Sequence, residues 1–247
     1  MILEFFLFII LCLTILVFFY KQSSTEFRLA QVSDLSKIPS LLKEKTPIVV
    51  QPLHIPNLWS LQEISHRQTL GNMIVPEFQM QLKQIGKIEN AVAPWSPEFA
   101  REVAVATGLP VWAEQSLKKL FTAPLYSYRT EVYLGPQGLQ KTFGLMTILA
   151  VTDGEATATL LNEQSDPYLP VPVQRWKGKV MSALTRDEAP LIGQIQCIDV
   201  ILRPGTALII PPHWKYCLEQ KEQTCCSVKI VVHHPISLMM EKVGMRT

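Results

Sequence analysis

The sequence offers five histidines as its best candidates for metal chemistry: His54, His66, His213, His233 and His234. One common type of iron centre needs two histidines and one carboxylate on the same side of the metal. None of these histidines stands two residues from an Asp or a Glu, the spacing at which two side chains share one face of a strand. The sequence therefore contains no paired metal ligands of this kind.

The positions of the individual histidines give no support for a metal site either. His233 and His234 end an apolar run just before Pro235. With no third ligand nearby, we interpret them as solvent-exposed histidines at a strand end, and metal binding by this pair is the alternative. His54 and His66 lie in N-terminal segments, where we expect surface or packing roles.

Signatures of other catalytic classes do not occur in the sequence. No serine occupies a G-x-S-x-G turn, and there is neither a P-loop nor a G-x-G-x-x-G loop. Cys217 lies four residues after His213, which leaves a Cys–His dyad open. On a strand or a loop, however, this spacing does not by itself bring the two side chains together.

The five cysteines give no support for a zinc site, because no pair has C-x-x-C spacing. Cys225 and Cys226 are adjacent, and adjacent residues on a strand face opposite ways, so these two do not pair with each other. We therefore expect free thiols in a reducing compartment.

Composition indicates a folded domain without a nucleic-acid partner. Of the 247 residues, 48% are hydrophobic and 18% are charged, which suits a packed core. The net charge of +2 gives no electrostatic reason to expect nucleic acid. Prolines (18) outnumber glycines (11) and separate short apolar runs, which favours a β-rich domain over a helical bundle.

The N-terminus predicts a membrane anchor over residues 1–20, in which Glu4 is the only charged side chain. About 20 helical residues cross a hydrocarbon core of about 30 Å. Phe18, Phe19, Tyr20 and Lys21 resemble an interfacial belt with a cation at its edge. A cleaved signal peptide is the competing interpretation, but a basic start and a small-x-small cleavage pattern are both missing.

The charges that flank the anchor predict its orientation. Lys21 and Arg28 follow the span and Glu4 precedes it, so the positive-inside rule places the larger domain in the cytoplasm of a single-pass membrane protein. Protease added to intact cells would then leave the domain uncut, and digestion from outside would refute this orientation.

Beyond a linker over residues 21–33, the chain predicts one domain over residues 34–240. Helices are expected over residues 35–42 after Asp34, over 97–107 between a Ser96 cap and Gly108, and over 116–121. Apolar or alternating runs predict strands, which are listed here: residues 47–50, 126–134, 145–151, 157–161, 198–202, 207–210 and 227–232. Many short strands separated by turns indicate an all-β sandwich or jelly-roll barrel, flanked by N-terminal helices.

Four stretches in this order resemble the cupin-like JmjC family of iron- and 2-oxoglutarate-dependent hydroxylases: residues 47–50, 133–138, 146–161 and 202–214. The last stretch, L-R-P-G-T-A-L-I-I-P-P-H-W, is the most specific, with a glycine turn, an apolar strand, a proline pair and a tryptophan. The resemblance covers roughly residues 34–235 and implies a double-stranded β-helix.

The same resemblance implies that the iron ligands have been lost. In this family a His-x-Asp or His-x-Glu pair follows the first glycine turn, and Phe143 and Leu145 lie near those two places here. The last ligand is a histidine two residues after the tryptophan, where this chain has Tyr216. A lysine that binds the cosubstrate is replaced by Ala156.

We therefore expect a membrane-anchored pseudoenzyme that binds or scaffolds an unidentified protein partner, with no catalytic residue, no metal and no cofactor. Tyr126, Tyr128, Trp214 and Tyr216 are the candidates for lining the barrel, although amphipathic aromatics at the edge of a core would look the same. The alternatives are a hydroxylase with non-standard metal ligands and a small-molecule binder that uses the barrel cavity.

Overall fold

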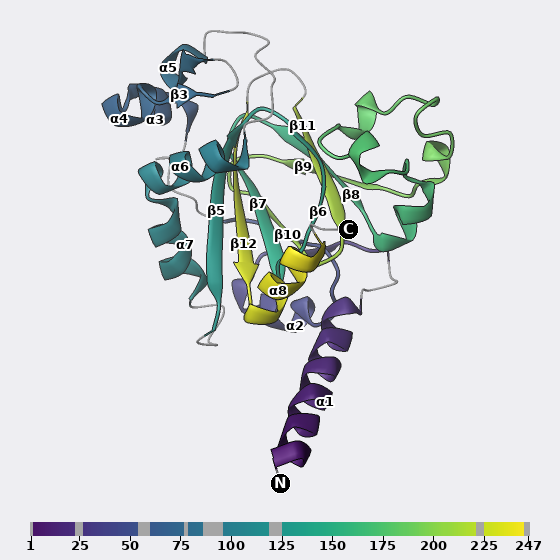
Figure 1. The fold of residues 1–247 in the computed structure, drawn as a ribbon. Coiled ribbons are helices and arrows are strands. Elements are labelled where there is room, and N and C mark those ends of the chain that lie inside the picture. The colour runs from purple at the N-terminus through teal and green to yellow at the C-terminus, as the bar shows by residue number, and fades with distance from the viewer. Residues whose placement is uncertain are drawn as a thin grey trace.

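The computed structural model describes residues 2–22, 27–53, 60–76, 79–85, 96–118, 125–220 and 225–244 (Figure 1). The strands of its main sheets are β1 (Ala30–Val32), β2 (Ile48–Val50), β5 (Ser127–Leu134), β6 (Gln137–Lys141), β7 (Met146–Asp153), β8 (Ala156–Leu161), β9 (Ile198–Leu202), β10 (Ala207–Ile210), β11 (Lys215–Gln220) and β12 (Cys226–His233). The helices are α1 (Ile2–Lys21), α2 (Ile38–Leu42), α3 (Leu61–His66), α4 (Gln68–Gly71), α5 (Leu82–Ile85), α6 (Pro97–Thr107), α7 (Leu109–Leu117) and α8 (Pro235–Gly244).

Two sheets form the core of the domain. The larger has six strands in the order β1-β2-β10-β7-β12-β5, and the smaller has four in the order β6-β11-β8-β9. All neighbours pair antiparallel except β1 and β2, which are parallel. The expected β-rich core with an apolar N-terminal helix is therefore confirmed.

Alternation along the strands of the six-stranded sheet separates two apolar cores. On β7, Ile148 and Ala150 belong to the core on the helix side, whereas Leu149 and Val151 belong to the core shared with the smaller sheet. The smaller sheet contributes residues such as Leu160 to that shared core. Because side chains alternate between the faces of a strand, the two sheets pack face to face.

Helices cover the outer face of the six-stranded sheet. Among them, α6 begins and ends at the residues that the sequence predicts. The Ser96 hydroxyl accepts a hydrogen bond from the Phe99 amide at 3.3 Å, and Gly108 ends the helix at φ 79°. α7 begins immediately after this glycine, so the helix expected over 116–121 is in part the last turn of α7. Residues 119–124 lie outside the described residues.

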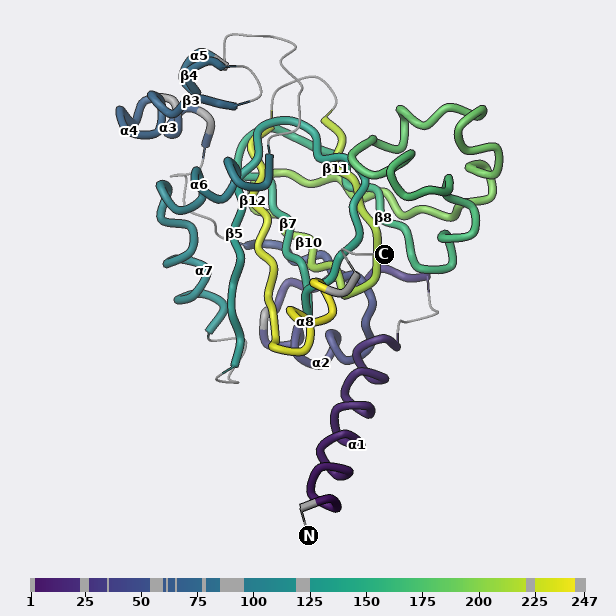
Figure 2. The backbone as a smooth tube through the Cα atoms, viewed as in Figure 1, coloured from purple at the N-terminus to yellow at the C-terminus, as the bar shows by residue number. Residues whose placement is uncertain are grey.

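Short 3₁₀ helices cover the outer face of the smaller sheet: η3 (Glu163–Tyr168), η4 (Val173–Arg175), η5 (Met181–Ala183) and η6 (Ile192–Gln194). We call residues 163–197 the excursion. Trp176 from the excursion is buried with Leu139 of β6 and Leu161 of β8 in a third apolar core. At the opposite side of the molecule, α3, α4 and α5 form a small group with β3 (Ile74–Val75) and β4 (Met80–Gln81) (Figure 2).

Several elements go beyond the sequence prediction. β1 forms within the segment expected to be a linker and extends the larger sheet by pairing with β2. β6 and β11 pair with each other and complete the smaller sheet. At the C-terminus α8 folds back against β12 and contacts α1.

Candidate functional site

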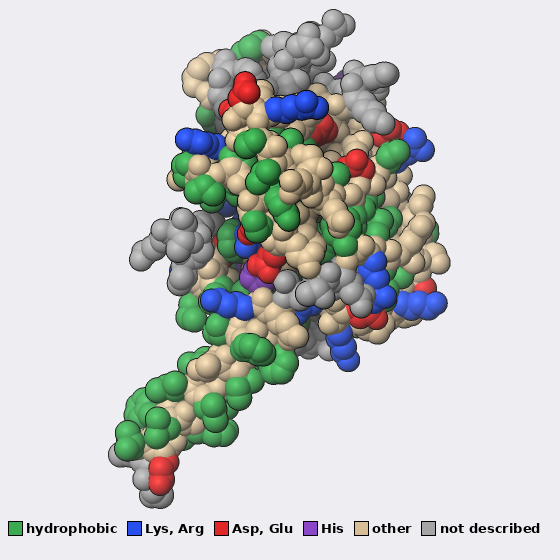
Figure 3. Space-filling view, turned by 90° about the vertical axis from the view of Figure 1, so that its right-hand side faces the viewer, with side chains coloured by type: hydrophobic (Ala, Val, Ile, Leu, Met, Phe, Trp, Pro, Cys, Tyr) green, Lys and Arg blue, Asp and Glu red, His purple; other side chains and the backbone are tan. Residues whose placement is uncertain are grey.

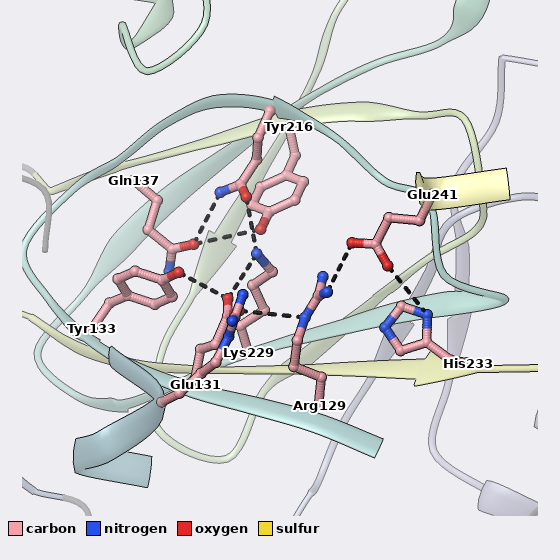
Figure 4. A network of polar contacts seen from close by, with 10 residues as sticks. Arg129, Glu131, Tyr133, Gln137, Tyr216, Lys229, His233 and Glu241 are labelled. Atoms are coloured by element: carbon pink, nitrogen blue, oxygen red, sulfur yellow. Dashed lines mark hydrogen bonds and ion pairs between the residues drawn. The ribbon is translucent and has the colours of Figure 1, made fainter. Parts of the chain in front are cut away.

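The faces that the two sheets turn toward each other are apolar at one end and polar at the other. On β2, β7 and β10 the inward side chains are aliphatic, among them Val49, Leu149 and Leu208. On β5 and β12 the positions that alternate with Val132, Val228 and Ile230 of the helix-side core are polar except for Val231: Arg129, Glu131, Tyr133, Ser227, Lys229 and His233. Figure 4 shows Arg129, Glu131, Tyr133, Lys229 and His233 in a network of polar contacts with residues of neighbouring elements.

An ion pair between Glu131 and Lys229 is the centre of this network. The strand register places the two residues directly opposite each other on β5 and β12, where opposite charges attract most strongly across a sheet. The Lys229 Nζ lies 2.9 Å from the Glu131 Oε2, and the Tyr133 hydroxyl donates to the same oxygen at 2.8 Å. The Glu131 Oε1 lies 3.2 Å from the Arg101 Nε, which reaches it from α6. Both carboxylate oxygens of this buried residue are therefore engaged.

A second carboxylate, Glu241 on α8, continues the network toward the end of β12. The Arg129 Nη1 donates to the Glu241 Oε1 at 2.8 Å, and the Arg129 Nε lies 3.4 Å from the Glu131 Oε1. The His233 Nδ1 lies 3.6 Å from the Glu241 Oε2, and His233 is buried. The sequence predicts a solvent-exposed histidine at this strand end. For His233 this prediction is wrong, because α8 folds over the side chain.

Amides connect the network to the smaller sheet. The Gln140 Oε1 on β6 accepts a hydrogen bond from the Lys229 Nζ at 2.9 Å. The Gln137 Nε2 donates to the Ser227 Oγ at 3.0 Å, and the Tyr216 hydroxyl donates to the Gln137 Oε1 at 3.5 Å. The polar groups thus bond mainly to one another across the gap between the sheets, as a buried polar network must if it is not to destabilise the fold.

Glu131 and Lys229 each shift the pKa of the other in the direction that favours the charged pair. Burial alone would raise the pKa of Glu131, but Lys229 and the Tyr133 hydroxyl outweigh it and hold that pKa below its usual value. Burial lowers the pKa of Lys229, and Glu131 opposes this shift. Burial, assisted by the charge on Glu131, raises the pKa of Tyr133 far above its usual value, so Tyr133 remains a neutral donor.

His233 makes the stability of the domain sensitive to acid. Burial is the main cause that lowers the pKa of His233, and the nearby Arg129 and Lys229 lower it further. Glu241 and Glu131 oppose this shift. The unfolded chain, with a histidine pKa of about 6.5, then binds more protons than the folded chain just below that pH. Stability is therefore retained above about pH 6.5 and lost as the pH falls below it.

We predict that His233→Phe weakens this loss on acidification, measured as the difference between denaturant midpoints at neutral and mildly acidic pH. Part of the dependence remains, because burial also lowers the pKa of His213. His66→Gln is the matched control, since His66 is exposed on α3. An unchanged pH dependence in the His233 variant would refute this role.

The structure divides the four candidate barrel-lining aromatics into two pairs. Trp214 and Tyr216 are buried in the core between the sheets, and Tyr216 pairs with Gln140 of β6 in the strand register. Tyr126 and Tyr128 pack against the core on the helix side of the larger sheet, and Tyr126 lies against the His234 ring. The structure thus joins only Tyr216 to the charge network, through Gln137, whereas the Trp214 ring stacks on Phe27 in the same core.

The places expected for lost metal ligands have structural partners instead. The carbonyl of Phe143 accepts a hydrogen bond from the Tyr20 hydroxyl of α1, and Leu145 packs against the helix-side core. Ala156, at the place of the cosubstrate lysine, is buried in the core between the sheets. His54 lies outside the described residues.

The dyad of Cys217 and His213 does not form. Cys217 faces the core under the excursion with Leu139 and Leu161, where burial raises the pKa of its thiol to about 12. His213 lies in the turn before β11, where its Nε2 donates to the Tyr20 carbonyl at 3.0 Å. All five cysteines lie in the described residues and none is in a disulfide, as expected.

A second charged cluster lies near the end of α1. The Lys141 Nζ is 3.4 Å from the Glu163 Oε1, the His213 Nδ1 is 4.0 Å from the same oxygen, and Lys215 contacts Asp166. Burial and Lys141 lower the pKa of the buried Lys215 to about 7, and the charge on Glu163 opposes this shift. Sequence reasoning missed both clusters, because each joins residues that are far apart in the chain.

Within the described residues, no three His, Cys, Asp or Glu side chains are grouped closely enough to hold a metal ion. Comparison with known proteins adds no assignment: no family model matches the chain. No curated protein matches its sequence either.

Proposed function

We propose that this chain is a membrane-anchored, cupin-like module that binds or scaffolds a protein partner and does not act as an oxygenase. The observation that supports it most is the Glu131–Lys229 ion pair, which lies where the two sheets face each other. A carboxylate that belongs to an internal ion pair with three cations around it is not available as a metal ligand.

The strand order supports a double-stranded β-helix. From β5 to β12 the chain alternates between the larger and the smaller sheet, except that β8 and β9 are consecutive in the smaller one. The resulting orders β10-β7-β12-β5 and β6-β11-β8-β9 are those expected when a paired strand ribbon winds into two facing sheets. This topology agrees with the resemblance to the JmjC family.

The donor set of the interior does not fit ferrous iron. Such a metal needs two imidazoles and a carboxylate directed at one point, whereas the inward place of the last ligand carries Tyr216, beside Gln137 and Gln140. Arg101, Arg129 and Lys229 add positive charge. Positive charge this close to Glu131 opposes the binding of a divalent cation.

The proposal of a membrane anchor is supported by the length and composition of α1 and by the charges that flank it. α1 is the one helix among the described residues that is long and apolar enough to cross a membrane, and a signal sequence would pass the same test. Its apolar surface is exposed to solvent outside a membrane (Figure 3), which a retained span explains. The cytoplasmic side remains the proposed location of the domain, with protease protection as its test.

A thermal-shift measurement on the full chain in detergent separates this proposal from its two alternatives. A ligand that binds only the folded state raises the melting temperature. We expect no increase with Mn²⁺, with 2-oxoglutarate, or with both together. An increase that needs both would support a hydroxylase with non-standard ligands, and an increase with one member of a metabolite panel would support a small-molecule binder.

A further inference from the structure

We propose that one face of the domain lies on the lipid surface of the membrane that α1 enters, with α8 as a helix in the interface. This face, called the base, comprises the end of α1 (residues 18–22), α2, α8 and Leu125. The inference rests on the proposed anchor and adds a second, peripheral membrane contact to it.

The end of α1 is fastened to the domain by several polar contacts. The Lys45 ammonium donates to the carbonyl oxygens of Phe19 and Gln22, as a cation at a helix C-terminus does. The Tyr20 hydroxyl bonds to a domain carbonyl, and the Tyr20 and His213 rings meet edge to face with centroids 5.0 Å apart. With these contacts the span continues directly into the base, so the base is held close to the lipid headgroups.

α8 has the side-chain pattern of an interfacial helix. Its buried side carries Ser237 and Glu241, and its exposed side carries Leu238, Met239 and Lys242. The exposed fractions are 36% for Leu238 and 53% for Met239. A surface helix that packs on a soluble domain normally turns polar side chains outward, whereas a helix that lies in a membrane interface turns apolar side chains and lysines outward.

Neighbouring residues extend this apolar surface. α8 contacts α1, and Leu125, which is 62% exposed, precedes the Tyr126 ring that lies against His234 at the start of α8. In Figure 1 the start of β5, α8 and α2 all lie at the end of the domain from which α1 leaves. The exposed apolar side chains therefore gather on the side that the anchor turns toward the bilayer.

Charge complementarity favours lipid over a protein as the occupant of the base. Exposed lysines stand at the end of α1, on both sides of α2 and on α8: Lys21, Lys37, Lys43 and Lys242. Figure 3 shows Lys and Arg side chains, with Asp and Glu among them, around the place where the apolar α1 joins the domain. Basic residues next to a span are attracted to anionic headgroups.

The test uses the full chain in vesicles of phosphatidylcholine and phosphatidylserine, with an environment-sensitive thiol probe at single sites. Burial raises the pKa of the Cys225 thiol to about 11 and that of the Cys226 thiol to about 12, so these thiols and Cys217 do not label at neutral pH. Cys197→Ser removes the exposed cysteine.

Three probe positions distinguish the outcomes. With Cys12→Ser also present, Met239→Cys reports on the base, and Val173→Cys on the excursion is the matched control of similar exposure. Cys12 alone reports on the anchor. We expect the probe at position 239 to shift to shorter wavelength and to be quenched by lipids with a shallow nitroxide. The probe at position 12 is quenched by a deep nitroxide, and the probe at 173 by neither.

A probe at 239 that behaves like the one at 173, while the Cys12 probe is quenched, overturns the inference and leaves the anchor intact. If the Cys12 probe is not quenched by lipid either, the anchor itself is refuted, and the inference falls with it.

Discussion

Glu131→Gln is expected to lower the free energy of unfolding by about 3–5 kcal/mol, the typical cost of removing one partner from a buried ion pair. The substitution keeps the shape of the side chain and removes its charge. Lys229 would then remain buried without a counter-charge, and Tyr133 would lose a charged acceptor. Chemical denaturation of the full chain in detergent, followed by circular dichroism, measures the change.

Two controls make this result specific to burial. Arg203 and Glu155 form an ion pair at 2.5 Å on the surface, and Arg203→Met should change stability by less than about 1 kcal/mol. The double variant Glu131→Gln with Lys229→Met should lose less than the sum of the single losses, because neither charge is left unpaired. Native-like stability of the Glu131 variant would show that the pair contributes little to the fold.

Gly138→Ala is expected to cost about 1–3 kcal/mol or more, the usual range for overpacking. A Cβ at this position would lie 1.9 Å from the carbonyl oxygen of Gly178, and that atom belongs to the backbone and cannot rotate away. The same contact is fixed by two backbone hydrogen bonds, Leu139 N to Lys179 O at 2.7 Å and Gly178 N to Leu139 O at 3.1 Å. The substitution should therefore loosen the excursion from β6.

Limited trypsin digestion reports this loosening, since Arg175 and Lys177 lie in the excursion. We expect faster cleavage there in the Gly138 variant. Gly193→Ala is the matched control, because a Cβ at Gly193 would meet no atom within 4 Å. Equal cleavage rates in the two variants would contradict the close contact between β6 and the excursion.

The strands with aliphatic or alternating patterns were predictable from the sequence, and β5, β7, β8, β9, β10 and β12 all form close to the expected places. β6 could not be predicted in this way, because Gln137 and Gln140 face the charge network while Leu139 faces the excursion. Its polar inward side has no hydrophobic signal, and only the fold reveals what it bonds to.

The charge network could not be predicted from the sequence either. Glu131 and Lys229 become neighbours only through the register of β5 and β12, which the sequence does not specify at that separation. His233 was expected in solvent because α8 was not foreseen, and this helix brings Glu241 over it. The apolar N-terminal helix, by contrast, depends on local composition, and it forms where the sequence predicts it.

The central claim is that the interior between the sheets holds its own ion pairs in place of a catalytic metal. The most direct test is the iron content of the full chain, purified in detergent from iron-replete cells and again after anaerobic addition of ferrous iron, with 2-oxoglutarate turnover measured on both samples. The account predicts far less than one iron per chain and no turnover. One tightly bound iron per chain, with turnover that depends on it, would contradict the account.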